Sequence, residues 1–233
     1  MTKEELLKIA KPILFNTDMV KAILDGRKTT TRRIIKPPKG RDNFKFTGDV
    51  YLLPEGKHGE EYLCAKCINP SIGSTYLVKC PYRKNDILYV RETWCWCPCW
   101  DCGMDTVEGC CDKTADKFYN HKKGEMGCYG YKASFEDSEQ PFDKWHPSIH
   151  MPKEVARIFL KVKDVRVERL QDIDDKGAYE EGAGEKDAIY YIGGRVCDFA
   201  KIWNSTIKKT DLDLYGWDAN PWVWVIEFEK KEI

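Results

Sequence analysis

The amino-acid sequence predicts an α+β fold built around a curved sheet or small barrel. Many segments have the pattern of strands, whereas the helices are few and short. The segment "ARIFLKVKDVRVERL" alternates apolar and polar residues over about 12 positions, as a long half-exposed strand does. The chain ends in a second β-prone segment, "PWVWVIEFE".

The first predicted helix covers residues 16–25. Met19, Val20, Ile23 and Leu24 have helical spacing, Asn16 or Thr17 is suited to the N-cap, and Gly26 to the C-terminal stop. The β-branched segment "TTTRRIIK" follows and closes at Pro37-Pro38, so Lys28 to Arg33 are expected to enter a strand. Alternation would put Lys28 and Thr31 on opposite faces of that strand, a conflict that a loop at Lys28 would remove.

Further strands are expected at 61–64, 74–79 and 87–93. Residues 95–127 break the pattern, because cysteines, glycines and charges occur there with little periodicity. After the long strand, Asp172 or Asp174 can cap a short helix that ends at Gly182, and a second helix is expected at 197–207.

The composition is that of a folded protein with balanced charge. A chain of 233 residues with 42% hydrophobic content can bury a core, as one domain with an insertion or as two small ones. Because 38 basic residues balance 38 acidic ones, a nucleic-acid partner would have to be bound by a local basic patch. Neither an apolar run of about 18 residues nor a secretory signal is found, so we expect a cytoplasmic protein with no membrane partner.

A local basic patch occurs in "GRKTTTRR", residues 26–33. Four cations and three threonines stand there, with no acidic residue between Asp25 and Asp42. Such a segment is suited to contacts with a phosphate or a base.

The cysteines favour metal binding. Ten of the 11 fall between Cys64 and Cys128, and the chain lacks an export signal, which disfavours a disulfide framework. Cys64 and Cys67 form one C-x2-C pair, and Cys99 and Cys102 form another, with the spacing that lets two thiolates bind one zinc.

We predict one four-cysteine zinc site in the 95–128 segment and a second site nearer the N-terminus. The ligands of the first are Cys99, Cys102, Cys110 or Cys111, and Cys128; those of the second are Cys64, Cys67, Cys80 and either Cys95 or Cys97. Four thiolates leave no open coordination position, so the zinc would be structural. Free buried cysteines or an iron–sulfur cluster are the alternatives.

Several segments together resemble the ASCH domain, a relative of the PUA fold, in the form common among phage and prophage proteins. They are "PILFNTDMVKAILDGRKTTTRR", "NDILYVRETW", "WHPSIHMPKEVARIFLKVKDVRVERLQDI", "GAYEEGA" and "NPWVWVIEFE". The resemblance implies a single domain over 1–233, a PUA-like small β-barrel with flanking short helices, and insertions at about 39–72 and 95–128, the latter cysteine-rich.

The family is associated with RNA or modified nucleosides, and one bacterial branch removes the acetyl group of N4-acetylcytidine. The residues of that amidohydrolase branch fall on Lys28, Thr31 and Glu181, and Arg33 matches a basic family position. The resemblance therefore implies an RNA- or nucleoside-binding cleft between "RKTTTRR" and "AYEEG". Arg32, Arg33, Arg91 and Glu92 are further candidates for substrate binding.

Two chemistries remain open for this cleft. An amide hydrolase needs a hydroxyl nucleophile and a base, so Lys28 would have to lose its proton, helped by burial or by Arg32 and Arg33. Alternatively, Glu181 keeps Lys28 charged, and the site binds and polarises a carbonyl. A non-enzymatic nucleic-acid or protein adaptor of phage origin, acting in the host cytoplasm, is the rival hypothesis.

Overall fold

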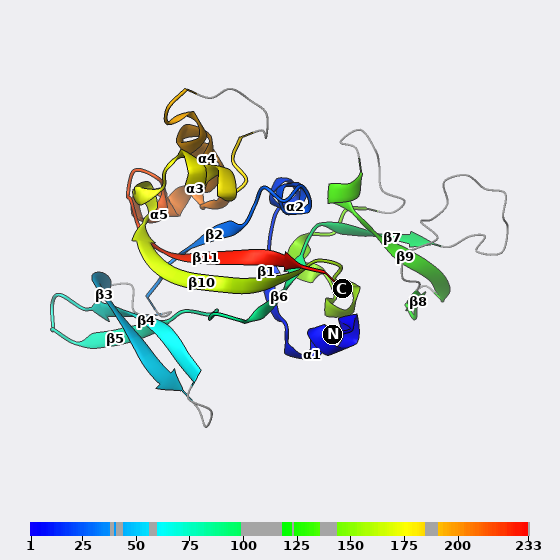
Figure 1. Ribbon diagram of the computed structural model, residues 1–233, viewed down its shortest axis with the longest axis horizontal. Helices are drawn as coiled ribbons and strands as arrows, with labels where there is room; N and C mark the ends of the chain where they lie inside the picture. The colour runs from blue at the N-terminus through cyan, green and yellow to red at the C-terminus, as the bar shows by residue number, and fades with distance from the viewer. Residues whose placement is uncertain are drawn as a thin grey trace.

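The two longest β-prone segments of the sequence pair to form the middle of the main sheet. In the computed structural model, β10 (Phe159–Arg169) is antiparallel to β11 (Trp222–Lys231), and the sheet has the order β1-β6-β10-β11-β2 (Figure 1). The strand β1 (Lys11–Leu14) is parallel to β6 (Ile87–Arg91), whereas β6 is antiparallel to β10 and β2 (Thr30–Ile34) is antiparallel to β11. The structure describes residues 1–37, 40, 44–55, 60–98, 118–122, 124–135, 144–184 and 191–232.

Two smaller antiparallel sheets flank the main one. One contains β3 (Lys45–Glu55), β4 (Glu60–Ile68) and β5 (Thr75–Lys79); the other contains β7 (Trp94–Pro98), β9 (Glu125–Tyr131) and β8 (Phe118–Asn120) in the order β7-β9-β8. They lie on opposite sides of the main sheet in Figure 1. The predicted α+β class is confirmed, while none of the three sheets closes into a barrel within the described ranges.

The helices are short, as predicted. They are α1 (Lys3–Ile9), α2 (Thr17–Leu24), α3 (Asp175–Glu180), α4 (Gly194–Thr206) and α5 (Leu212–Tyr215), together with 3-10 turns at Lys132–Ser134, Ser148–His150, Lys153–Val155, Leu170–Asp172 and Lys209–Asp211. The predicted N-cap of α2 is confirmed, because the Asn16 side chain accepts a hydrogen bond from the Met19 N–H at 2.9 Å. The Asp174 side chain caps α3 in the same way.

The prediction of little regular structure over 95–127 is wrong at the two ends of that segment. Residues 95–98 belong to β7, and β8 and the first residues of β9 also fall within the segment. In β7, Cys95 and Cys97 alternate with Trp96 as strand residues do, but the sequence analysis treated these cysteines as candidate metal ligands. Residues 99–117 lie outside the described residues.

Strand β11 separates two packed layers, and this arrangement positions the site. Trp224, Ile226 and Phe228 belong to the main core, which α2 covers. Val223 and Val225 belong instead to a second apolar cluster with residues of α3 and α4. The edge strand β2 pairs with β11, and the loop that precedes it contacts the C-terminal ends of α2 and α3.

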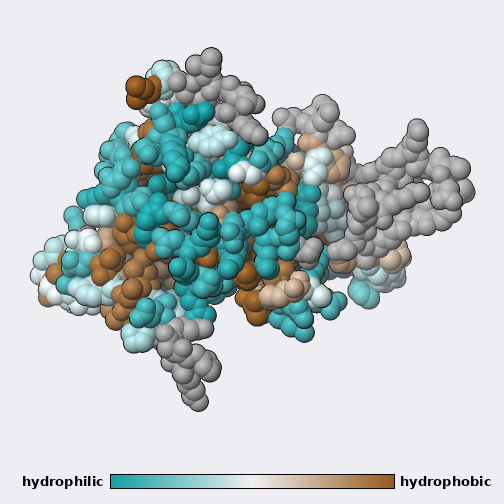
Figure 2. All heavy atoms as spheres, viewed as in Figure 1, coloured by the Kyte–Doolittle hydropathy of each residue, from teal (hydrophilic) through white to brown (hydrophobic). Residues whose placement is uncertain are grey.

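The surface is mostly hydrophilic in the view of Figure 2, with apolar patches that include part of the β3-β4-β5 sheet. Leu52 of β3 is 62% exposed. Within the described part of the chain, no helix has both the length and the apolar character needed to cross a membrane.

Candidate functional site

Lys28 lies in the loop between α2 and β2, not in the strand. The loop turns at Gly26, whose φ of +74° favours glycine, and the N–H groups of Arg27 and Lys28 both donate to the Ala22 carbonyl, at 2.9 and 3.0 Å. Strand β2 begins two residues later, at Thr30. The loop removes the conflict that strand alternation would have created, and the Lys28 side chain turns into the protein with 2% of the residue exposed.

Glu181 ends helix α3 beside that loop. It is the C-cap residue, and Gly182 follows with a φ of +91°. A Cβ atom on Gly182 would lie 2.9 Å from the Ala22 side chain, so the end of α3 packs closely against α2. The Thr29 N–H donates to the Glu180 carbonyl at 2.9 Å, which ties the Lys28 loop directly to α3.

The Lys28 ammonium and the Glu181 carboxylate form a buried ion pair. Their side chains are 0% and 3% exposed, and Lys28 Nζ lies 2.7 Å from Glu181 Oε2. Nζ also donates to the backbone carbonyls of Thr30 and Glu181, each at 2.7 Å. Three acceptors match the three N–H groups of an ammonium, so these contacts favour the protonated form.

Burial opposes that preference. It is the largest influence on the pKa of Lys28 and lowers it, Glu181 raises it, and Arg33 and Arg32 lower it further. The three influences considered from the sequence all act on this group: burial and the two arginines favour the neutral amine, and Glu181 favours the ammonium.

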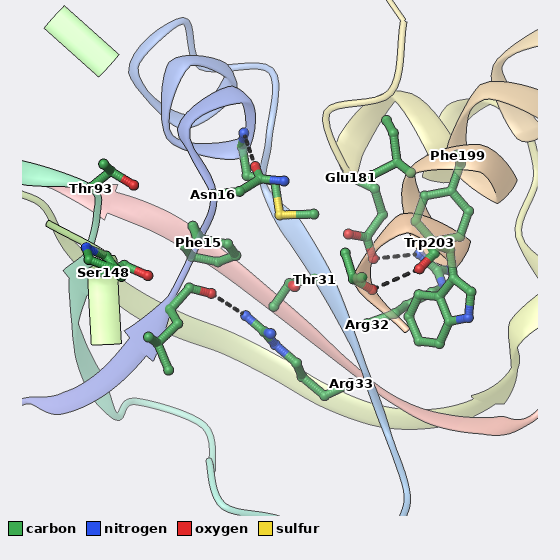
Figure 3. Close-up of a pocket in the computed structure, with 15 residues that line it drawn as sticks. Phe15, Asn16, Thr31, Arg32, Arg33, Thr93, Ser148, Glu181, Phe199 and Trp203 are labelled. Atoms are coloured by element: carbon green, nitrogen blue, oxygen red, sulfur yellow. Dashed lines mark hydrogen bonds and ion pairs between the residues drawn. The ribbon is translucent and has the colours of Figure 1, made fainter. Parts of the chain in front are cut away.

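Thr31 and Glu181 line one cavity of about 320 Å³ (Figure 3). Thr31 lies in β2 and is 3% exposed. Its hydroxyl forms no hydrogen bond with another residue in the described part of the chain. Lys28 is not among the residues that line the cavity; it lies behind Glu181.

The two arginines of the cluster differ in their partners. Arg32 donates from Nη1 to Glu181 at 3.3 Å and from Nη2 to Glu168 at 3.0 Å, and its side chain is 4% exposed. Arg33 is half-buried and donates to the Leu14 carbonyl at 2.7 Å. Both line the cavity. The structure therefore brings five of the predicted residues together: Lys28, Thr31, Arg32, Arg33 and Glu181.

The sequence analysis missed the apolar wall of the cavity. Phe15, Phe199 and Trp203 contribute to it, and Phe15 also lies below two cations, with its ring centroid 5.5 Å from Lys28 Nζ and 5.4 Å from the Arg33 guanidinium. Phe199 and Trp203 are four residues apart in the predicted helix 197–207, so they lie on one face of it. The helical spacing of apolar residues does not distinguish the wall of a cavity from ordinary core.

Arg91 and Glu92, also predicted to bind substrate, do not line this cavity. Arg91 donates to the Ile149 carbonyl. Glu92 is 1% exposed and accepts two hydrogen bonds of 2.9 Å from Arg157. Glu92 therefore belongs to an ion pair with Arg157.

The predicted metal ligands fall into three groups. Cys64 and Cys67 are three residues apart on β4, so their side chains leave opposite faces of the strand, and Cys80 belongs to the main core, where burial raises the pKa of its thiol to about 12. Cys128 lies opposite Cys97 in the β7-β9 pair. Cys99, Cys102, Cys110 and Cys111 lie outside the described residues.

Cys128 has two other cysteines beside it. Cys95 and Cys97 share its face of the sheet, with 3.7 Å between their Sγ atoms, and the three thiols pack against Trp145. The hydrogen bond with Cys128 lowers the pKa of Cys97, but the hydrogen bond with Cys95 and burial raise it by more, to about 11. A search of the described residues finds no group of three or more His, Cys, Asp or Glu able to hold a metal ion, and the zinc sites stay a prediction.

Comparisons of the chain with protein-family models, with curated proteins and with solved structures gave no match.

Proposed function

We propose that this protein is an ASCH-type, PUA-like protein that binds RNA or a modified nucleoside in the cavity lined by Thr31 and Glu181. The observation that carries the proposal is that Glu181, 153 residues after Lys28, contacts the lysine at 2.7 Å and lines the same cavity as Thr31. Recognition sites for small molecules combine an apolar wall with a few placed polar groups. Phe199 and Trp203 supply the wall, while Thr31 and Arg33 supply polar groups.

The cavity is suited to a planar, hydrogen-bonding ligand. A nucleobase has an apolar face for the aromatic wall and a polar edge that a hydroxyl, a carboxylate and a guanidinium can contact. A volume of about 320 Å³ is at the lower end of the range for small-molecule sites. The Arg33 guanidinium, which also lines the cavity, favours a ligand with a carbonyl oxygen or another acceptor.

Hydrolysis of an N4-acylated cytidine is the catalytic form of this proposal. The Thr31 oxygen would attack the acyl carbonyl while its proton passes to a base, and the C–N4 bond would break as that proton is given to N4 of the departing cytidine. Water would then hydrolyse the acyl–threonine ester and release the carboxylic acid. All three N–H groups of the Lys28 ammonium donate hydrogen bonds within the protein, so the protonated lysine cannot accept a proton. Transfer of one proton to Glu181 along their 2.7 Å hydrogen bond would give the neutral amine. Binding alone needs no such step, and we therefore rank binding before catalysis.

The test separates the enzyme from the adaptor. Purified protein is incubated with N4-acetylcytidine, and the release of cytidine and acetate is followed by chromatography. A hydrolase requires turnover that Thr31→Val abolishes, with the thermal midpoint retained. Thr29→Ala is the matched control, because this neighbouring threonine is exposed and does not line the cavity. Salt-sensitive RNA binding without turnover by the wild type would support the adaptor. Absence of both binding and turnover would refute the proposal.

A further inference from the structure

Arg33 differs from Lys28 and Arg32 because no carboxylate of the described residues lies within ion-pair distance of it, and the charge of Glu181 raises its pKa only from farther away. Lys28 and Arg32 are both paired with Glu181, and Arg32 also with Glu168. Within the described part of the chain, no ion pair joins Arg33 to a carboxylate. Its neutral partners are the Leu14 carbonyl and the Phe15 ring.

The remaining donors of Arg33 are available to a ligand. A guanidinium has five N–H groups, and one of its nitrogens, Nη2, donates to Leu14. No nitrogen of the Arg33 side chain is both buried and without a hydrogen-bond partner. Those that make no hydrogen bond are therefore in contact with solvent. Burial lowers the pKa of Arg33, but a guanidinium with a reference pKa above about 12 stays charged at neutral pH.

The cavity continues on both sides of Arg33. In Figure 3, Glu181, Phe199 and Trp203 lie on one side of the close-up, Thr93 and Ser148 lie on the other, and Phe15, Thr31 and Arg33 lie between them. The end with Thr93 and Ser148 offers two hydroxyl groups. A single base at the aromatic end would leave Arg33 and these hydroxyls without a ligand contact.

We infer that the cavity binds a nucleotide within an RNA strand in preference to a free nucleoside, with a backbone phosphate on Arg33. The inference rests on the proposed function. The base lies against Phe199 and Trp203, the phosphate accepts two hydrogen bonds from the free side of the guanidinium, and the adjoining ribose reaches Thr93 and Ser148. Paired N–H groups of arginine match two phosphate oxygens, and the phosphate supplies the negative charge that Arg33 lacks.

Titration calorimetry with three probes tests this inference: cytidine, cytidine 3′-monophosphate and the dinucleoside monophosphate CpC. The wild type is expected to bind CpC on the order of tenfold more tightly than cytidine, with the monophosphate between them. Arg33→Gln should weaken CpC binding more than cytidine binding, so that this difference is lost, and should lower the salt slope of CpC binding by about 1. Arg33→Lys keeps the charge without the paired donors and should recover part of the difference.

The controls separate a failed inference from a failed function. Lys201→Gln removes a cation whose side chain is 79% exposed on α4, outside the residues lining the cavity, and should change nothing. Equal affinity of the wild type for cytidine and CpC, or an Arg33→Gln variant that still prefers CpC, overturns the phosphate site while the proposed function stands. If the wild type binds none of the three probes, both are refuted. Thermal midpoints of all variants show whether the fold is kept.

Discussion

Replacing Glu181 by glutamine tests the buried ion pair on which the site is built. The substitution keeps the shape of the side chain and removes its charge. Lys28, whose side chain is fully buried, would then keep its two carbonyl acceptors and lose the only carboxylate paired with it in the described structure. Arg32 would also lose one of its two carboxylates.

The expected loss is large because the charge left behind is buried. Removing one partner of a buried ion pair typically destabilises a protein by about 3–5 kcal/mol. The two carbonyls and the glutamine oxygen still accept hydrogen bonds from Lys28, so we expect the lower end, about 3 kcal/mol at pH 7. Glu168→Gln is the matched control. The Glu168 side chain is 23% exposed and pairs with Arg32 and Arg166, but each of these arginines keeps a second carboxylate, Glu181 or Glu227, so the loss should be about 1 kcal/mol or less.

The pH dependence gives the sign of the effect. In the folded state the pKa of Lys28 is lower than 10.5. At pH values between the folded and unfolded pKa, the unfolded chain binds more protons than the folded one, so the free energy of unfolding rises with pH. Without Glu181, which raises this pKa, that interval extends to lower pH. Urea unfolding at pH 6, 7, 9 and 10 should therefore show the deficit of Glu181→Gln shrinking toward high pH.

Two results would contradict this account. A loss at pH 7 equal to that of Glu168→Gln would mean that Lys28 is neutral or solvated in the folded protein. A deficit that stays constant from pH 6 to pH 10 would mean that glutamine disturbs packing and not charge. The double variant Lys28→Met with Glu181→Gln removes both charges, and it should be more stable than Glu181→Gln alone.

Three further predictions concern other parts of the chain. Glu92→Gln leaves Arg157 without its two charged hydrogen bonds and should lower the free energy of urea unfolding by about 3 kcal/mol, whereas an unchanged midpoint would show that this pair adds no stability. Gly182→Ala puts a Cβ 2.9 Å from Ala22 at a φ of +91°, so we expect a lower thermal midpoint and weaker ligand binding; wild-type values for both would contradict the close packing of α2 and α3. The Cys97 thiol, with a pKa of about 11, should react slowly with iodoacetamide in the folded protein at pH 8, and rapid alkylation would show that a thiolate is present. Because this pKa is raised by folding, the free energy of unfolding should fall as the pH rises from about 9 toward 11.

Much of the fold could be predicted because local signals agreed with tertiary structure. Residues close together in the sequence are enough to specify three elements: the caps specify α2, the apolar–polar alternation specifies β10, and the β-branched segment specifies β2. The strands β7 to β9 were harder, because their pairing joins residues on either side of the 99–117 segment, and local periodicity does not report such pairing.

The site was predicted in composition but not in geometry. Motif positions from the family resemblance pointed to Lys28, Thr31 and Glu181, and these do meet. The complete burial of Lys28 could not be foreseen, since lysine is usually solvated. It depends on the contact between the α2–β2 loop and the end of α3, which lie 153 residues apart in the chain.

The basic cluster therefore divides into cations with different roles. Lys28 donates all of its N–H groups within the protein, and the Nη groups of Arg32 are paired with two carboxylates, so both stabilise the junction of loop, strand and helix. An exchange of either for a neutral residue should first affect folding. Arg33 forms no ion pair in the described structure and lines the cavity, so its exchange should first affect ligand binding. A run of positive charge that looks uniform in sequence thus contains cations paired within the protein and a cation without an ion pair at the cavity, and it is the partners of each side chain that distinguish them.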